Sequence, residues 1–190
     1  MKQAKLLNSK EHKRLTAVIN AKRYPTRNHT IVALSFYAGL RACEIASLKV
    51  KDVFDENYEV RDSIQLAASQ TKGNHAGTAL VSKRLAVQLK KFGRQYRQIL
   101  NRQNAPLIFS AKGEGFSAQT IINLFQNLYA EAGITGASSH SGRRQFVTEL
   151  ADKGISARVI QALVRHKHLN TTMRYIEIND KKLRNAIELV

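Results

Sequence analysis

The chain of 190 residues contains one cysteine, two prolines and no tryptophan. A single cysteine, Cys43, excludes an intramolecular disulfide and a cysteine-based metal cluster, and favours a reducing compartment in which Cys43 is a small core residue. No apolar run approaches the ~20 residues that cross a membrane. The N-terminus lacks the hydrophobic stretch of a secretory signal. These absences predict a soluble, cytoplasmic protein without a membrane partner.

Acidic residues are also scarce. Fourteen Asp and Glu stand against 31 Lys and Arg, which gives a formal net charge of +17. Such a charge opposes a compact fold by self-repulsion unless a polyanion relieves it. Nucleic acid is the obvious candidate, because each neutralised phosphate releases condensed counterions. A merely soluble basic protein, or one that binds anionic lipid, would have the same composition.

The chain shows no internal repeat, low-complexity tract or Pro-rich linker. Hydrophobic residues make up 43% of it, which argues against global disorder. A chain of this size buries roughly 70% of its unfolded surface and needs no disulfide or metal for stability. We therefore expect a single domain over residues 1–190.

The first 40 residues favour helices. Asn8-Ser9-Lys10-Glu11 is typical of a helix start, and an apolar stripe follows at spacings of three and four. Pro25 is expected to interrupt the chain. Residues 30–40 are apolar on nearly all sides and predict a buried helix, with Gly39 at its end.

Residues 50–81 change character. Strand-forming residues are broken by polar turns at 55–57 and 72–74, which predicts short antiparallel hairpins. The strand formers are Val50, Val53, Tyr58, Val60, Ile64 and Leu66.

The rest of the chain returns to helical periodicity. Residues 83–100 predict a helix whose basic face is either solvated or in contact with DNA, and residues 107–109 a brief extended segment. A further helix starts at Ser117 and ends at Gly133. Three or four short helices follow, with breaks near Gly154 and residues 168–170. The expected fold is mainly α with a small antiparallel β-sheet.

Polar residues concentrate in four short stretches, 39–44, 70–74, 139–144 and 165–175. Arg41 directly follows an apolar helix, so its burial would require an anionic partner, and Glu44 could provide a structural ion pair. His140 and Arg143 would share a face if the segment is helical. Each feature alone has an ordinary structural explanation, such as a hairpin tip or a packed tyrosine.

The order and spacing of these stretches together indicate a functional site. Gly39-Leu40-Arg41-x-x-Glu44, a hairpin lysine at Lys72, His140-x-x-Arg143, and His166 nine residues before Tyr175 follow one another along the chain. This pattern resembles the tyrosine recombinase (lambda-integrase-like, phage integrase) family from about residue 8 to the C-terminus. The resemblance implies the catalytic domain of a DNA breaking-rejoining enzyme. It implies no metal or other cofactor.

Three of the six active-site positions that the resemblance implies act on the scissile phosphate. Arg41 and Arg143 are expected to clamp it, and His166 to add a hydrogen bond. Preorganised cations stabilise the charge that builds on the non-bridging oxygens. Arginine suits this task because its planar fork matches phosphate geometry.

The other three positions make and break bonds. By the same resemblance, Tyr175 is the nucleophile, which forms a 3′-phosphotyrosyl link that conserves the bond for religation. His140 assists proton movement at the tyrosine. Lys72 protonates the departing 5′ oxygen.

The sequence departs from the family pattern beside the site. The glycine that usually precedes the second histidine is Arg165, and the position after Arg143, often histidine, is Arg144. We expect further contacts to DNA phosphates from four basic residues, Arg144, Arg165, Lys167 and Arg174.

The family usually carries an N-terminal core-binding domain, and only about eight residues precede the first expected helix here. The chain thus resembles short, catalytic-domain-only members, including those that invert fimbrial promoters. The partners implied are double-stranded DNA, further copies of the chain in a synaptic tetramer, and accessory DNA-bending proteins. The apolar positions of segment 180–190 are expected to dock on a neighbouring protomer. A bacterial, phage or mobile-element protein of the nucleoid is implied.

Three other functions are open. Residues 154–171 could form the helix-turn-helix of a non-catalytic DNA-binding regulator, although Tyr175 argues against it. A type IB topoisomerase-like enzyme would share the chemistry and relax DNA of unrelated sequence. A basic RNA-associated protein would explain none of the spacing.

Overall fold

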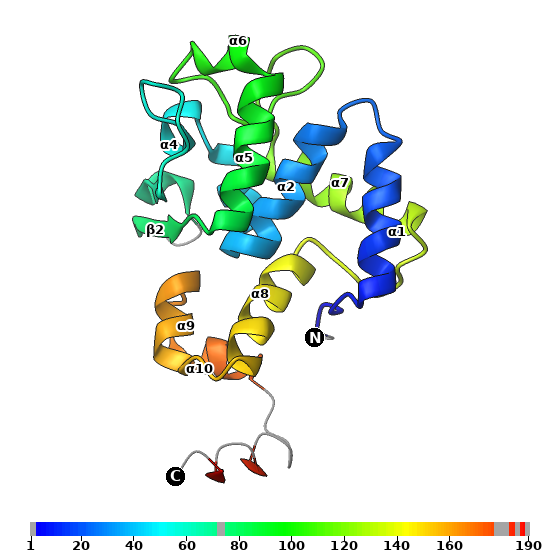
Figure 1. Ribbon diagram of the computed structural model, residues 1–190, viewed down its shortest axis with the longest axis vertical. Coiled ribbons are helices and arrows are strands. Elements are labelled where there is room, and N and C mark those ends of the chain that lie inside the picture. Colours follow the sequence, from blue (N-terminus) through cyan, green and yellow to red (C-terminus); the bar gives the residue numbers. More distant parts are fainter. Residues whose placement is uncertain (1–2, 72–74, 177–182, 185–186, 189–190) are drawn as a thin grey trace.

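The structure is a computed structural model that describes residues 3–71, 75–176, 183–184 and 187–188. Short helices surround a central helix, with one small sheet at the edge (Figure 1). Along the chain the elements are α1 (Ser9–Asn20), α2 (Pro25–Ala38), α3 (Ala42–Ser47), α4 (Val50–Val53), β1 (Ser63–Leu66), the 3₁₀ turn η1 (Ala68–Gln70), β2 (Gly77–Leu80), α5 (Lys83–Gln95), α6 (Arg97–Leu100), α7 (Ala118–Glu131), α8 (Ser141–Asp152), α9 (Ala157–Val164) and α10 (Leu169–Met173). This confirms the predicted fold class. None of the described helices is long and apolar enough to cross a membrane.

Helix α1 begins where the sequence predicted. The Asn8 side chain accepts a hydrogen bond from the Glu11 N–H at 2.9 Å, and the Glu11 carboxylate accepts one from the Asn8 N–H at 3.0 Å. This reciprocal pair satisfies two of the backbone donors that a helix start leaves unpaired.

The central helix α2 starts earlier than predicted. The chain is interrupted before Pro25, as expected, since α1 ends at Asn20 and Pro25 is the first residue of α2. A proline fits there, since its fixed φ suits a helix and its missing N–H has no partner in the first turn. The helix ends at Gly39, whose φ of 61° is left-handed. Helices α5 and α8 pack on α2 (Figure 1).

The sheet is smaller than predicted. Strands β1 and β2 pair antiparallel, with Leu66 opposite Gly77. The prediction that Val50 and Val53 lie in a strand is wrong, because they form α4. The Asp52 carboxylate accepts a hydrogen bond from the Lys49 N–H at 2.8 Å and so caps this short helix. Val60 forms only an isolated bridge with Phe54.

The predicted helix over 83–100 is divided. Tyr96 leaves the helical conformation at φ −118° and separates α5 from α6. Of the predicted extended segment 107–109, only Phe109 forms an isolated bridge, with Gly115, whereas residues 107–108 form a bend. Ser117 caps α7, and its hydroxyl accepts from the Thr120 N–H at 3.1 Å.

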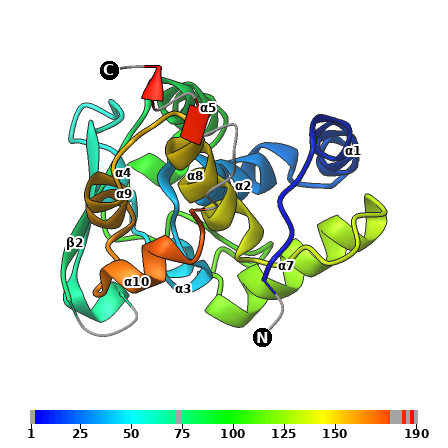
Figure 2. The same cartoon turned by 90° about the horizontal axis from the view of Figure 1, so that it is seen from below.

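Two hydrophobic clusters hold the molecule together. The larger, called the main core below, is formed by buried side chains of α1 to α7 and both strands. The smaller, called the C-terminal cluster, has three buried residues, Val147, Ile160 and Val164. It lies among α8, α9 and α10, which form the lower part of Figure 1. Figure 2 shows α9 between β2 and α8, so the C-terminal helices contact the rest of the molecule on two sides.

Candidate active site

Arg41 lies at the start of α3, immediately after the left-handed turn at Gly39. Its backbone N–H donates to Glu44 Oε2 at 2.9 Å and its Nη1 to Oε1 at 2.8 Å. Glu44 is fully buried. Burial alone would raise the pKa of Glu44, but Arg165, the Arg41 N–H and Arg143 together lower it. The predicted ion pair between Arg41 and Glu44 is therefore present, with a charged carboxylate.

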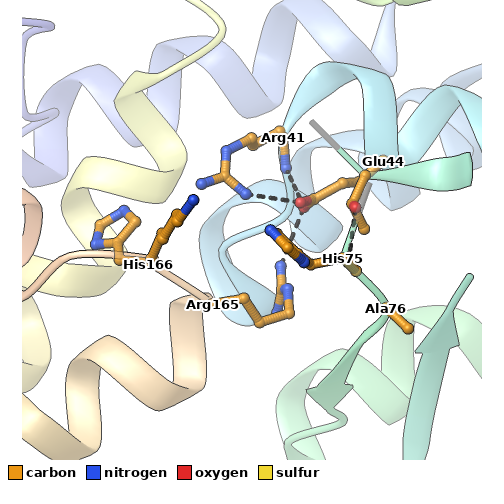
Figure 3. A pocket seen from close by; sticks show the side chains of 8 residues that line it. Arg41, Glu44, His75, Ala76, Arg165 and His166 are labelled. Atoms are coloured by element: carbon orange, nitrogen blue, oxygen red, sulfur yellow. Dashed lines mark hydrogen bonds and ion pairs between the residues drawn. The ribbon is translucent and has the colours of Figure 1, made fainter. Parts of the chain in front are cut away.

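Arg165 reaches the same carboxylate from the other side. Its Nη2 donates to Glu44 Oε2 at 3.0 Å, and its Nη1 donates to the Leu163 carbonyl at 3.1 Å. Figure 3 shows Glu44 between the guanidinium groups of Arg41 and Arg165. Both terminal nitrogens of the Arg165 side chain thus have acceptors within the protein.

Arg143 is buried in the first turn of α8. Its Nη1 donates to the Gly39 carbonyl and its Nη2 to the Val164 carbonyl, so one side chain joins the end of α2 to the end of α9. Burial, together with the charge of Arg41, lowers the pKa of Arg143 to about 9. The guanidinium group still carries its charge at neutral pH.

His166 follows Arg165 and is buried. Its Nδ1 lies 2.8 Å from the Thr172 hydroxyl, and its ring stacks on that of Tyr175, with the centroids 6.1 Å apart and the planes at 21°. Burial first, then the charges of Arg143 and Arg41, lower the pKa of His166 to about 4. The imidazole is therefore neutral at pH 7 and can still donate one N–H.

Apart from Arg143, these groups line a cavity of about 450 Å³. Figure 3 shows part of its lining, which consists of Arg41, Glu44, Thr71, His75, Ala76, Arg165, His166 and Lys167. His75 was not singled out from the sequence, and its only signal was its position three residues after Lys72. Lys72 itself lies outside the described residues.

A second cavity of about 870 Å³ holds the other predicted pair, His140 and Tyr175. The remaining lining residues are Gln3, Ala4, Lys5, Thr135, Gly136, Ser138, Arg144 and Arg174. His140 is the N-cap residue immediately before α8 and makes no side-chain capping hydrogen bond, whereas Arg143 lies within the helix. The stacked rings of His166 and Tyr175 connect the two cavities.

The predicted phosphate contacts differ in their surroundings. Lys167 and Arg174 are exposed. Arg144 Nη1 donates to the Ala4 carbonyl, and the Arg174 carbonyl accepts from the Gln3 amide at 3.2 Å. The N-terminal segment therefore lies against the start of α8 and the end of α10, beside His140 and Tyr175. Cys43 is half-buried and lies outside both clusters.

The fold is that of the phage integrase family. The model of that family matches residues 5–182, and the chain belongs to it. The resemblance to tyrosine recombinases is thereby confirmed. Tyrosine recombinase XerA of Pyrococcus furiosus is 28% identical over 189 residues, which cover 97% of this chain and 61% of the relative. Tyrosine recombinase XerC of Lactobacillus leichmannii is 28% identical over 172 residues, which cover 86% and 55%.

The solved structures agree. The crystal structure of XerA recombinase superposes with a TM-score of 0.77 at 26% identity and covers 100% of this chain and 66% of that one. A lambda integrase dimer bound to a COC′ core site has a TM-score of 0.69 at 18% identity, which shows the shared fold. The chain spans about half to three-fifths of the length of the curated relatives it matches.

Proposed function

We propose that this chain is the catalytic part of a site-specific DNA recombinase that cleaves and rejoins duplex DNA through Tyr175. One observation carries the proposal: segments far apart in the sequence converge on Arg143. Its side chain bonds the carbonyl two residues before Arg41 and the carbonyl two residues before His166. The His166 ring in turn stacks on Tyr175. A purely structural cluster would not need two arginines and a histidine beside a tyrosine.

The two arginines would stabilise the scissile phosphate. Glu44 orients Arg41, and two carbonyls orient Arg143, before any substrate arrives. Groups fixed in advance need no reorganisation when negative charge develops on the non-bridging oxygens. His166 is neutral at pH 7, so its role is to donate a hydrogen bond to the same phosphate. The Thr172 hydroxyl at Nδ1 fixes the ring, which leaves Nε2 for that bond.

The bond changes then follow. The Tyr175 oxygen attacks phosphorus and loses its proton toward His140, which lines the same cavity. The bond from phosphorus to the 5′ oxygen breaks, and Lys72 supplies the proton to that oxygen. The 3′-phosphotyrosyl bond is later attacked by a 5′ hydroxyl, which releases Tyr175 and restores the DNA.

Duplex DNA is the proposed substrate. The charge of +17 suits a polyanion. Two of the similar structures are XerH bound to its difH substrate and the lambda integrase dimer bound to a core site. We assign Lys167, Arg174 and Arg144 as contacts to flanking phosphates. We also propose assembly into a tetramer on DNA, with help from DNA-bending proteins, in the bacterial cytoplasm. The exposed Leu183 and Ile187 are available for contacts between protomers.

Covalent trapping tests the proposal. The protein is mixed with nicked suicide duplexes that cover the DNA flanking its own gene, denatured in SDS, and examined for a DNA-linked band. Tyr175→Phe should abolish the band, because no other change removes only the attacking oxygen. Tyr37→Phe is the matched control and should retain it, since Tyr37 belongs to α2, lies beneath Arg84 and lines neither of the two cavities.

Other outcomes would overturn the proposal. A band that survives in Tyr175→Phe would exclude Tyr175 as the nucleophile. Tight DNA binding without any band would favour the regulator. Relaxation of plasmids of unrelated sequence, dependent on Tyr175, would instead indicate a topoisomerase-like enzyme.

A further inference from the structure

The side chain of Arg165 lies in the space above Gly77. Gly77 is the first residue of β2 and pairs with Leu66. A Cβ built on Gly77 would lie 2.6 Å from Arg165 Cδ and 3.4 Å from its Cγ. These atoms belong to the middle of the arginine side chain rather than to its flexible end. Any side chain at position 77 would therefore displace Arg165.

The backbone of Arg165 is also unusual. Its φ of 57° and ψ of 45° are left-handed, a conformation that favours glycine. The side chain is only 12% exposed, and its Nε is buried without a hydrogen-bond partner. A residue held in this way needs compensating contacts, and its guanidinium group donates to the Glu44 carboxylate and to the Leu163 carbonyl.

Glu44 explains what these contacts achieve. The carboxylate is fully buried and shares its two oxygens between Arg41 and Arg165. Without Arg165, the Arg41 side chain would have to neutralise most of that charge and would turn further toward Glu44. Less of its guanidinium would then face the cavity.

We propose that Arg165 is a positioning residue, and that Gly77 is its matched partner. Arg165 holds Glu44 so that Arg41 presents its free nitrogens to the cavity, and its left-handed turn directs the next residue, His166, to the same place (Figure 3). Gly77 leaves the room that this arrangement requires. Arg165 thus acts through its neighbours and does not touch the phosphate. The role in catalysis rests on the proposed function.

A double-mutant cycle tests the matched pair. Gly77→Ala should displace Arg165 and slow cleavage at saturating DNA by about tenfold to a hundredfold, the effect of misplacing a catalytic group by about 1 Å. Arg165→Gly should give a similar loss. The double variant should be no slower than Arg165→Gly, because the added methyl group then meets no side chain. Losses that multiply would overturn the pairing.

A swap makes the test stricter. The Cβ direction of Gly77 points at the Arg165 stem, so an arginine at 77 would run through the same space toward Glu44. Gly77→Arg alone should be the slowest variant, since two arginines would compete for one space. Gly77→Arg combined with Arg165→Gly should recover cleavage to within a few-fold of the starting protein. Failure of this recovery in a folded double variant would contradict the proposal.

The salt dependence of DNA binding separates positioning from direct contact. A lost phosphate contact reduces the slope of log affinity against log salt by about 0.9. Arg165→Gly should leave the slope unchanged, whereas Lys167→Met, at the exposed cavity edge, should reduce it. An equal reduction in both would show that Arg165 touches a phosphate.

The double-mutant cycle of Gly77 and Arg165 also has a readout that does not require cleavage of DNA. Thermal unfolding of the same four proteins should show that Gly77→Ala lowers the melting temperature only when Arg165 is present. If the starting protein never cleaves DNA, the proposed function fails. The coupling between the melting temperatures of the Gly77 and Arg165 variants would still show whether the two residues are in contact. If it cleaves and neither readout shows coupling, the inference fails alone.

Discussion

The main core and the C-terminal cluster differ in size, and the site is divided between them. Arg41 stands on helices whose side chains belong to the main core. His166 and Tyr175 lie in the region held by Val147, Ile160 and Val164, and Tyr175 itself packs against that cluster. Arg143 joins the two regions through its carbonyl contacts. Of the proposed phosphate-binding residues, Arg41 thus stands on the better-packed region, whereas His166 stands on the smaller one together with the proposed nucleophile Tyr175.

This difference has a thermodynamic consequence. A segment with few buried apolar contacts opens at a lower free-energy cost than the whole molecule unfolds. The helices α8 to α10 should therefore detach from the main core before it melts. Such an arrangement lets Tyr175 approach or leave the arginines without disturbing Arg41.

The largest expected effect is that of Arg143→Met, which breaks the connection between the regions. Cleavage should fall by about 10²–10³-fold or more, as for loss of a preorganised donor. The two freed carbonyls should lower the free energy of unfolding by about 1–3 kcal/mol each at most. Covalent trapping and urea unfolding measure the two effects. Arg158→Met, on the exposed face of α9, is the control. Near-normal cleavage by Arg143→Met would refute its assigned role.

Paired core truncations give the next largest effect. Leu34→Ala in the main core should lower the global free energy of unfolding by about 2–5 kcal/mol. Val164→Ala should cost about 2 kcal/mol, from lost burial of two methyl-sized groups. Native-state hydrogen exchange should show that Val164→Ala speeds exchange in α9 but not in α2. Equal acceleration in both helices would mean that the regions do not open separately.

The smallest expected effect is a pH dependence. Folded His166 has a pKa of about 4 against 6.5 for the ordinary group. Between these values the unfolded chain binds a proton that the folded chain does not, so stability falls as pH is lowered from about 6.5. His166→Asn should flatten this decline. His29, whose pKa burial also lowers, contributes with the same sign, so His29→Asn is the comparison.

Measurements of unfolding between pH 6.5 and 4.5 isolate these histidines. Below that range Glu44 adds a loss of the same sign, because its lowered pKa means that the folded state resists protonation. An unchanged pH profile in His166→Asn would show that the histidine is not kept neutral by the fold.

The sequence predicted those elements whose signals are local. The start of α1 at Asn8 and the end of α2 at Gly39 depend on a cap and a left-handed glycine, both visible in the sequence. The start of α2 at Pro25 was missed because a proline fits both a break and a first helical position. Val50 and Val53 favour strands by propensity, but the Asp52 cap and burial in the main core place them in a helix.

The site was predictable as a set of residues but not as a set of contacts. Motif spacing pointed to Arg41, Arg143, His166 and Tyr175, because their chemistry requires those residue types. Their roles stay predictions until tested, as does that of Lys72. Nothing in the spacing indicated that Arg165 lies against Gly77, since that contact arises only when α9 packs beside β2.

The Arg143 side chain also couples the binding of an anion at the site to the docking of the C-terminal helices on the rest of the molecule. An anion that bound this guanidinium group only while it holds both carbonyls would favour the arrangement in which Gly39 and Val164 lie close together. By reciprocity, docking of the C-terminal helices must raise the affinity for that anion by the same factor. A ligand at a hundred times its dissociation constant would stabilise the docked form by about 2.7 kcal/mol. Binding of the substrate phosphate would then stabilise the docked position of the C-terminal helices.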